Sequence, residues 1–175
     1  MKRRVTILGV LVSFILVGVA AAAPVRLARH PDYRAGRIAF SYLGDIWVAG
    51  EDGSNVVRVT DNTGRDVYPR FSPDGKWIAF SSNRYGNYDV FVVPVTGGVP
   101  KRLTSHTGNE EVVGWTRDSL RILFRAGRGD GAFPSVATLY EVPAAGGADR
   151  ALPVDWGYWG AYSPDGKQFV FNRHP

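Results

Sequence analysis

The sequence predicts an all-β protein built from β-propeller blades, and three observations support this fold class. A ten-residue phrase occurs three times, as FSPDGKWIAF from Phe71, WTRDSLRILF from Trp115 and YSPDGKQFVF from Tyr162. The copies begin 44 and 47 residues apart, a period typical of repeat architectures. Each copy reads as strand, tight turn and strand, and two further strands follow the first and second copies. Four short antiparallel strands in about 44 residues match the size of one blade.

The third and fourth strands of each unit are marked by their own repeats. In successive units an apolar second strand is followed by a third strand, which begins at Asp45, Asp89 and Thr138. A glycine turn comes next, and short closing arms complete the units at 57–60, 101–104 and 150–152. We therefore expect each blade to be a simple antiparallel meander.

The turn inside the repeated phrase has the residues that a type I turn requires. In Ser72-Pro73-Asp74-Gly75, proline presets the first central dihedral and glycine takes the last position, and the turn at 163–166 has the same residues. The middle copy, 116–119, reads Thr-Arg-Asp-Ser and lacks both proline and glycine. That hairpin is expected to be less rigid.

The repeat divides the chain into blades at about 25–62, 67–105 and 111–153, with the start of a fourth from 159. About three and a half blades would leave an open sheet edge, whereas a closed ring normally needs about four to eight. We therefore expect 24–175 to be an incomplete propeller, and the remaining blades to lie further along a longer polypeptide. The alternative is a homo-oligomer in which several chains complete one ring.

The N-terminus has the pattern of a secretory signal. Lys2, Arg3 and Arg4 precede an uncharged apolar stretch that ends in small residues, Ala20 to Ala23. We predict a signal peptide at 1–23 that is cleaved, and hence a periplasmic or secreted protein. An uncleaved membrane anchor is the alternative, because the apolar stretch is almost as long as the roughly 20 residues that are needed to span a bilayer.

The net charge and the absence of cysteine exclude several kinds of partner, cross-link and metal site. The formal charge of +5 falls to about +2 once the three cationic signal residues are removed. The remaining cations are scattered, so no nucleic-acid partner is expected. The chain has no cysteine, which excludes disulfides and thiolate metal sites.

Aromatic residues recur at fixed positions of the repeat, which favours a packing role. Two sets, Trp47, Phe91, Tyr140 and Phe71, Trp115, Tyr162, are expected in the core, and so are Trp156 and Trp159, which could otherwise form a ligand platform.

Periodic placement indicates a structural role for the recurrent acids too. Asp45, Asp89, Asp74, Asp118 and Asp165 are expected to accept hydrogen bonds from nearby backbone. The acidic segments 61–66 and 129–131 were considered as calcium sites, but neither has the spacing of ligand residues found in a calcium-binding loop.

No chemistry is predicted for these residues. His30 and His106 are expected in loops, no histidine belongs to a metal-binding pair, and no G-x-S-x-G elbow occurs. We accordingly predict no catalytic, cofactor-binding or metal-binding residues in this chain.

The order of the blades resembles a known family. The lead-in VRLARHPDYRAGRIAFSYLGDIWVA, then VYPRFSPDGKWIAFSSNRYGNYDVFVVPVTGGVPKRLTSHTG and EEVVGWTRDSLRILFRAGR, are similar to the opening propeller of bacterial tricorn-type serine proteases. Arg29-His30-Pro31 and Val113-Gly114-Trp115 are the more specific pieces, since TolB-type proteins and prolyl-oligopeptidase relatives share the WD40-like S-P-D-G-K hairpins.

The resemblance implies a six-bladed propeller followed by a second propeller, a PDZ-like module and a serine peptidase core that lie outside this chain. The segment would then be non-catalytic and would guide or admit peptides or unfolded polypeptides to that domain. The alternatives are a TolB-like periplasmic protein-binding propeller and the propeller cap of a prolyl-oligopeptidase-like hydrolase. The TolB family carries an α/β domain for which about fifteen residues between the signal and Ile38 leave no room.

Overall fold

A computed structural model describes residues 27–128, 137–154 and 157–173. Within these ranges every regular element is a β-strand, and the strands form four antiparallel sheets. They are β1 (Arg29–Arg34), β2 (Arg37–Tyr42), β3 (Asp45–Gly50) and β4 (Val57–Arg58); β5 (Asp66–Phe71), β6 (Trp77–Ser82), β7 (Asp89–Pro94) and β8 (Lys101–Arg102); β9 (Glu110–Trp115), β10 (Arg121–Ala126), β11 (Thr138–Pro143) and β12 (Arg150–Ala151); and β13 (Gly157–Tyr162) with β14 (Phe169–Arg173).

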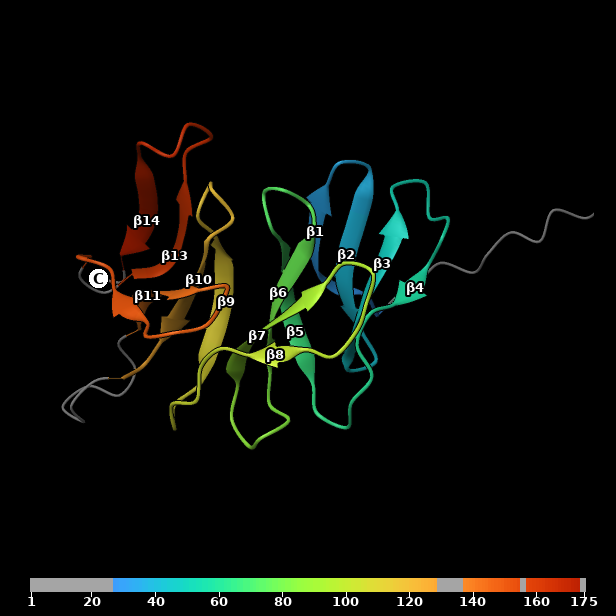
Figure 1. Cartoon of the computed structure of the whole chain (residues 1–175), viewed down its shortest axis with the longest axis horizontal. Coiled ribbons are helices and arrows are strands. Elements are labelled where there is room, and N and C mark those ends of the chain that lie inside the picture. Colours follow the sequence, from blue (N-terminus) through green and yellow to red (C-terminus); the bar gives the residue numbers. More distant parts are fainter. Residues whose placement is uncertain (1–26, 129–136, 155–156, 174–175) are drawn as a thin grey trace, which may run out of the picture.

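The predicted fold class is confirmed, because the three four-stranded sheets are meanders whose strands pair in chain order. The four sheets stand next to one another in chain order (Figure 1). The first strand of each sheet contacts the first strand of the next, so β1, β5, β9 and β13 form a series of neighbours. In a propeller these first strands are the inner ones, around the central channel. Among the described residues no helix is long and apolar enough to cross a membrane, and the predicted signal at 1–23 lies outside them.

The repeated turns share one geometry, including the copy that lacks glycine. Gly75 and Gly166 have φ of 71° and 72°, and Ser119 adopts the same left-handed conformation with φ of 63°. All three amides donate to the carbonyl three residues earlier, at 2.8 to 3.0 Å. The divergent turn Thr116–Ser119 therefore keeps the shape of its neighbours, because serine tolerates a conformation that glycine adopts at lower cost.

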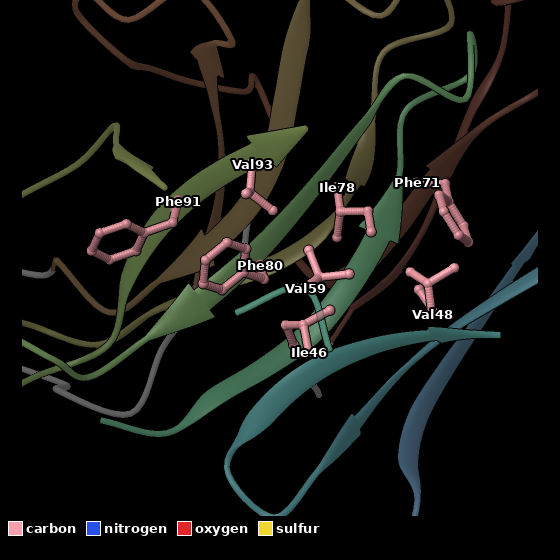
Figure 2. Packing of buried hydrophobic residues seen from close by; sticks show 9 residues of the cluster. Ile46, Val48, Val59, Phe71, Ile78, Phe80, Phe91 and Val93 are labelled. Atoms are coloured by element: carbon pink, nitrogen blue, oxygen red, sulfur yellow. The ribbon is translucent and has the colours of Figure 1, made fainter. Parts of the chain in front are cut away.

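Apolar side chains of adjacent sheets pack against one another to form the core. Ile46 and Val48 from the first sheet meet Phe71, Ile78 and Phe80 from the second, as Figure 2 shows. A similar cluster joins the second and third sheets, and a smaller one joins the third and fourth. Each blade thus buries its apolar face against the next, as in other repeat proteins.

The six repeated aromatic residues take part in this packing to different degrees. Phe71, Phe91 and Trp115 are buried as predicted, and Tyr140 packs against the cluster between the second and third sheets. Trp47 and Tyr162 are only half-buried. The indole of Trp47 donates to the Tyr42 carbonyl, so its polar edge faces a loop.

The recurrent aspartates divide into two groups. Those in the turns accept hydrogen bonds from nearby backbone as predicted, for example Asp74 from the Lys76 amide at 3.1 Å. In the strand-opening pair Asp45 does accept from the Asn62 amide at 3.4 Å, but the prediction missed the ion pairs that Asp45 and Asp89 form with Arg58 and Arg102 of the closing strands, both at 2.7 Å. A buried carboxylate requires a charged partner more than it requires one amide, which explains the difference.

A second repeated ion pair links the first strand of a blade to the residue that follows its second strand. Arg84 binds both carboxylate oxygens of Asp66 at 3.0 and 3.1 Å, and the Asp66 side chain is fully buried. In the next blade two nitrogens of Arg128 donate to a single carboxylate oxygen of Glu110, and Arg128 also contacts Asp149. These pairs fix the inner strands against the rest of each sheet.

Arginines of one blade also hold the turn of the next. Arg34 and Arg37 from the first sheet donate to the carbonyls of Pro73 and Gly75 in the turn of the second. Arg117 in the third blade likewise donates to Pro164 in the fourth. The repeated turn is therefore a contact between blades as well as a hairpin connection.

Candidate functional site: aromatic rings and arginines on the inner strands

Each inner strand is irregular at the same point of the repeat. The register shifts between Arg29 and Asp32 in β1, between Val67 and Arg70 in β5 and between Gly157 and Gly160 in β13. A β-bulge of this kind redirects a side chain out of the regular alternation. The inner strands thus present side chains that a regular strand would not.

Two aromatic residues in these bulges have a left-handed backbone. His30 has φ of 52° and Tyr68 has φ of 55°, and each is followed by proline. Such a conformation is uncommon outside glycine and is often found at functional sites. The expectation that His30 lies in a loop was wrong, because the residue belongs to β1, whereas His106 does lie in a loop.

Rings from three different blades converge at these bulges. The centroids of the His30 and Tyr68 rings lie 4.2 Å apart, and Tyr68 meets Trp159 edge to face at 6.1 Å. Because Tyr68 belongs to the second sheet and Trp159 to the fourth, the contact passes the inner side of the third blade. We call His30, Tyr68, Tyr158, Trp159 and Arg125 the inner cluster.

Arg125 joins the third blade to this cluster. Its guanidinium lies 4.0 Å from the Tyr158 ring centroid and 4.6 Å from that of Trp159. Its Nε donates to a Glu111 carboxylate oxygen at 2.9 Å, which neutralises the charge and fixes the plane of the group. Planar cations suit this arrangement, because a guanidinium can stack on a ring and hydrogen-bond at its edge together.

The surroundings of the inner cluster change the pKa values of His30 and Tyr68. Burial lowers the pKa of His30, and the guanidiniums of Arg70, Arg29 and Arg65 lower it further against a smaller opposing effect of Glu111. Burial also raises the pKa of Tyr68, again with Glu111 contributing. Both rings are therefore uncharged at neutral pH, so the imidazole and the phenol can serve as stacking and hydrogen-bonding surfaces.

Hydrogen bonds between neighbouring inner strands hold the cluster in place. The Asp32 carboxylate accepts from the Phe71 amide at 2.8 Å, which ties β1 to β5. Arg70 donates to the Val113 carbonyl at 3.1 Å, and the Trp115 indole donates back to the Arg70 carbonyl at 2.9 Å. The frame around the rings is thus formed by side chain–backbone hydrogen bonds between neighbouring inner strands.

Two depressions lie beside the cluster. One, of about 390 Å³, is lined by Glu111, Arg125 and Tyr158 together with the loop at Gly108 and Asn109. The other, of about 450 Å³, lies between the first and second blades next to His30. Both are within the size range of ligand sites, roughly 300 to 1,000 Å³.

The acidic segments considered for metal binding have other partners. Asp61 contacts Arg58, Asn62 accepts from the Gly64 amide, and Asp66 pairs with Arg84. Residues 129–131 lie outside the described ranges. In the part of the chain that the structure describes, no three His, Asp or Glu side chains are grouped to hold a metal ion.

Sequence reasoning did not single out the inner cluster as a site. Trp159 was expected in the core, and it does pack against the cluster of Val113, Leu123 and Leu139, but it also contacts Tyr68 and Arg125. Trp156 lies outside the described residues. The available signal was that Tyr68 and Trp159 each precede the first residue of a copy of the repeated phrase by three positions.

Blades of this topology, with a structured inner face and an outer rim of short strands, define the class of β-propeller domains. The chain matches the family model of the tricorn protease N-terminal beta propeller domain over residues 25–175, so it belongs to that family. The resemblance noted in the sequence is confirmed.

Individual relatives agree with this assignment. The chain is 35% identical over 143 residues to tricorn protease homolog 1 of Streptomyces coelicolor, a match that covers 81% of this chain and 12% of that protein. Among solved structures it resembles a tricorn protease, with a TM-score of 0.68, 24% identity and coverage of 80% of this chain and 14% of the other.

A putative TolB from Agrobacterium tumefaciens is also similar, with a TM-score of 0.69, 21% identity and coverage of 85% and 59%. At these identities the structural likenesses show the fold alone. The chain spans about an eighth of the length of its Streptomyces relative, 12%.

Proposed function

We propose that this chain is the non-catalytic propeller segment of an exported, tricorn-like serine peptidase, and that its inner strands guide or admit polypeptide substrates to a catalytic domain elsewhere in the parent protein. The observation that carries the proposal is the convergence of His30, Tyr68 and Trp159 from three blades on the inner strands. The family supports it, because the chain belongs with the propellers of tricorn proteases.

The chemistry of the cluster suits weak, sequence-tolerant contacts with an extended chain. Aromatic rings offer apolar faces to any side chain, and the tyrosine hydroxyl and imidazole nitrogens can pair with backbone amides. Tyr158 is exposed, and Trp159 and Tyr68 are half-buried, so the rings are partly accessible. A platform of this kind would retain unfolded polypeptide without selecting its sequence.

Binding of an unfolded probe to ring variants of the cluster tests this proposal. We expect Tyr68→Ala with Trp159→Ala to weaken the binding of dye-labelled casein by roughly 10-fold, since each ring contact contributes about 0.5 to 1.5 kcal/mol beyond its buried area. Tyr85→Ala is the matched control, because Tyr85 is 63% exposed and lies outside the inner strands. Equal binding by the wild type and the double variant would refute the proposal.

Two parts of the proposal need separate measurements. Export rests on the cationic start and the apolar stretch to Ala23, and N-terminal sequencing of the protein from its source should begin close to Pro24. Membership of a longer peptidase predicts a native polypeptide several times heavier than 19.1 kDa. A native mass close to that of the chain would favour a TolB-like binding propeller or a homo-oligomeric ring.

A further inference from the structure

The third blade departs from the repeat at one buried position of its third strand. The strand registers place Glu141 where the first two blades have Val48 and Val92. Both valines are buried, and so is Glu141, with 1% of its surface exposed. Burial of a carboxylate costs free energy that burial of a valine does not. Because a blade folds with valine at this position, the acid points to a role other than packing.

Two arginines share one oxygen of this buried acid. Arg150 approaches Glu141 Oε2 with its Nε at 3.2 Å and its Nη2 at 2.9 Å, and Arg121 Nε lies 3.8 Å from the same oxygen. The other oxygen, Oε1, accepts from the hydroxyl of Tyr162 in the fourth blade. One negative charge therefore holds two positive charges close together, although like charges repel.

The guanidinium of Arg121 has hydrogen-bonding capacity that the described residues do not use. Its counterpart in the first blade, Arg37, donates to the carbonyl of Gly75 in the next turn at 2.9 Å. Within the described ranges Arg121 makes no such bond, and its Nη1 is buried without a hydrogen-bond partner. A buried donor without a partner is costly, so an anion that reached this nitrogen would remove that cost.

A depression of about 400 Å³ lies beside these arginines, where the third and fourth blades meet. Its charged lining residues are Arg117, Arg121, Arg150, Asp118 and Glu141. One oxygen of Asp118 already accepts from an amide of its own turn at 2.9 Å. The three guanidiniums outnumber the two carboxylates, so the depression has a net positive charge and suits an anionic ligand.

We propose that this depression binds a tetrahedral oxyanion of the phosphate class. Arg121 and Arg150 would each hold one oxygen, and Arg117, whose Nε donates to the Pro164 carbonyl, would hold a third through its Nη groups. The fork of N–H donors in a guanidinium matches phosphate oxygens, and three cations can bind three oxygens of a tetrahedral anion, whereas a carboxylate has only two. None of the described lining residues belongs to the inner cluster, so the proposal does not rest on the proposed function.

Titration calorimetry of the full chain with inorganic phosphate, in a phosphate-free buffer of low ionic strength, tests the proposal. One phosphate is expected to bind per chain, and Arg121→Gln or Arg150→Gln should weaken it by at least roughly 10-fold, because charge-assisted hydrogen bonds are lost. Lys101→Gln is the matched control. Lys101 occupies in the second blade the place of Arg150 and is not among the lining residues, so binding should stay unchanged.

Glu141→Gln separates an anion site from a cluster that only joins two blades. Removal of this negative charge should strengthen phosphate binding by roughly 3- to 10-fold, since the carboxylate competes for the same two guanidiniums. A cluster with a purely structural role gives no such gain. Arg121→Lys keeps the charge but loses the fork, so its affinity should lie between those of the wild type and Arg121→Gln, and it replaces Arg121→Gln if that variant does not fold.

Phenyl phosphate distinguishes the two sources of a phosphate group. Leu120 in the lining is 65% exposed, so tighter binding of phenyl phosphate than of inorganic phosphate would support the site and assign it to organic phosphomonoesters. Equal or weaker binding of phenyl phosphate would support the site and assign it to free phosphate. The proposal is overturned if inorganic phosphate does not bind saturably below about 10 mM, if the arginine variants bind it like the wild type, or if Glu141→Gln gains no affinity.

Discussion

Removal of Arg125 should destabilise the chain by an amount that the structure allows one to estimate. The side chain is 11% exposed, stacks on Tyr158 and Trp159 at 4.0 and 4.6 Å and donates to Glu111, which is 21% exposed. Each stack contributes about 0.5 to 2 kcal/mol and a charge-assisted hydrogen bond about 1.5 to 3. Allowing for partial solvent screening of the pair, we expect Arg125→Ala to lower the free energy of unfolding by about 2 to 3 kcal/mol.

Urea denaturation followed by tryptophan fluorescence measures this loss, provided that the m-value stays constant. Arg125→Lys keeps the charge but loses the planar stack and the fork, so it should recover less than half of the stability. A double-mutant cycle between Arg125 and Trp159 should show a coupling of about 0.5 to 1.5 kcal/mol. A loss below about 0.5 kcal/mol for Arg125→Ala, or no coupling, would refute the view that this guanidinium joins the third and fourth blades.

Three further perturbations follow from the same structure. Gly75→Ala should cost about 1 to 2 kcal/mol because φ is 71°, and Gly75→Asn should cost less; equal stability of both variants in urea would contradict the left-handed turn. Asp66→Ala should cost about 3 to 5 kcal/mol, since it leaves the guanidinium of Arg84, which is 10% exposed, without its partner, whereas Asp66→Asn should cost less because it keeps one acceptor. The lowered pKa of His30 means that the unfolded chain binds its proton first, so stability should be full above about pH 6.5 and fall as the pH decreases. His30→Gln should remove that part of the decrease, and identical pH profiles of the melting temperature would argue against it.

Much of the fold could be predicted from the sequence because the relevant forces are local. The turn residues at 72–75 and 163–166 determine backbone conformation within four residues, and the apolar alternation around them determines which face is buried. The repeat of these local signals at a nearly constant period predicted strand order and blade topology. The turn at Thr116–Ser119 shows that neighbouring blades can impose the same shape on a weaker local signal, because the Ser119 hydroxyl accepts from the Asp74 amide of the preceding blade at 3.0 Å.

The partners of charged side chains could not be predicted in this way. Periodicity suggested backbone partners for Asp45 and Asp89, yet both form ion pairs, with Arg58 and Arg102, on closing strands that are adjacent only after each sheet has formed. The third blade replaces this pair with Glu141, whose side chain is 1% exposed, bound to Arg150 and to the Tyr162 hydroxyl of the next blade. Burial raises the pKa of Tyr162 to about 12, which keeps this phenol protonated as a donor.

The sequence by itself determined the repeat, the strand order, the hairpin turns and the family, because these depend on residues close together in the chain or on their regular recurrence. Only the tertiary structure decided that His30, Tyr68 and Trp159 meet, and that Tyr162 of the fourth blade contacts Glu141 of the third. These contacts join residues from different blades, and their distances depend on how the sheets pack and where the inner strands bulge. Neither the packing of the sheets nor the position of the bulges follows from the spacing of residues along the chain. The fold could therefore be predicted from local sequence patterns, and the candidate sites could not.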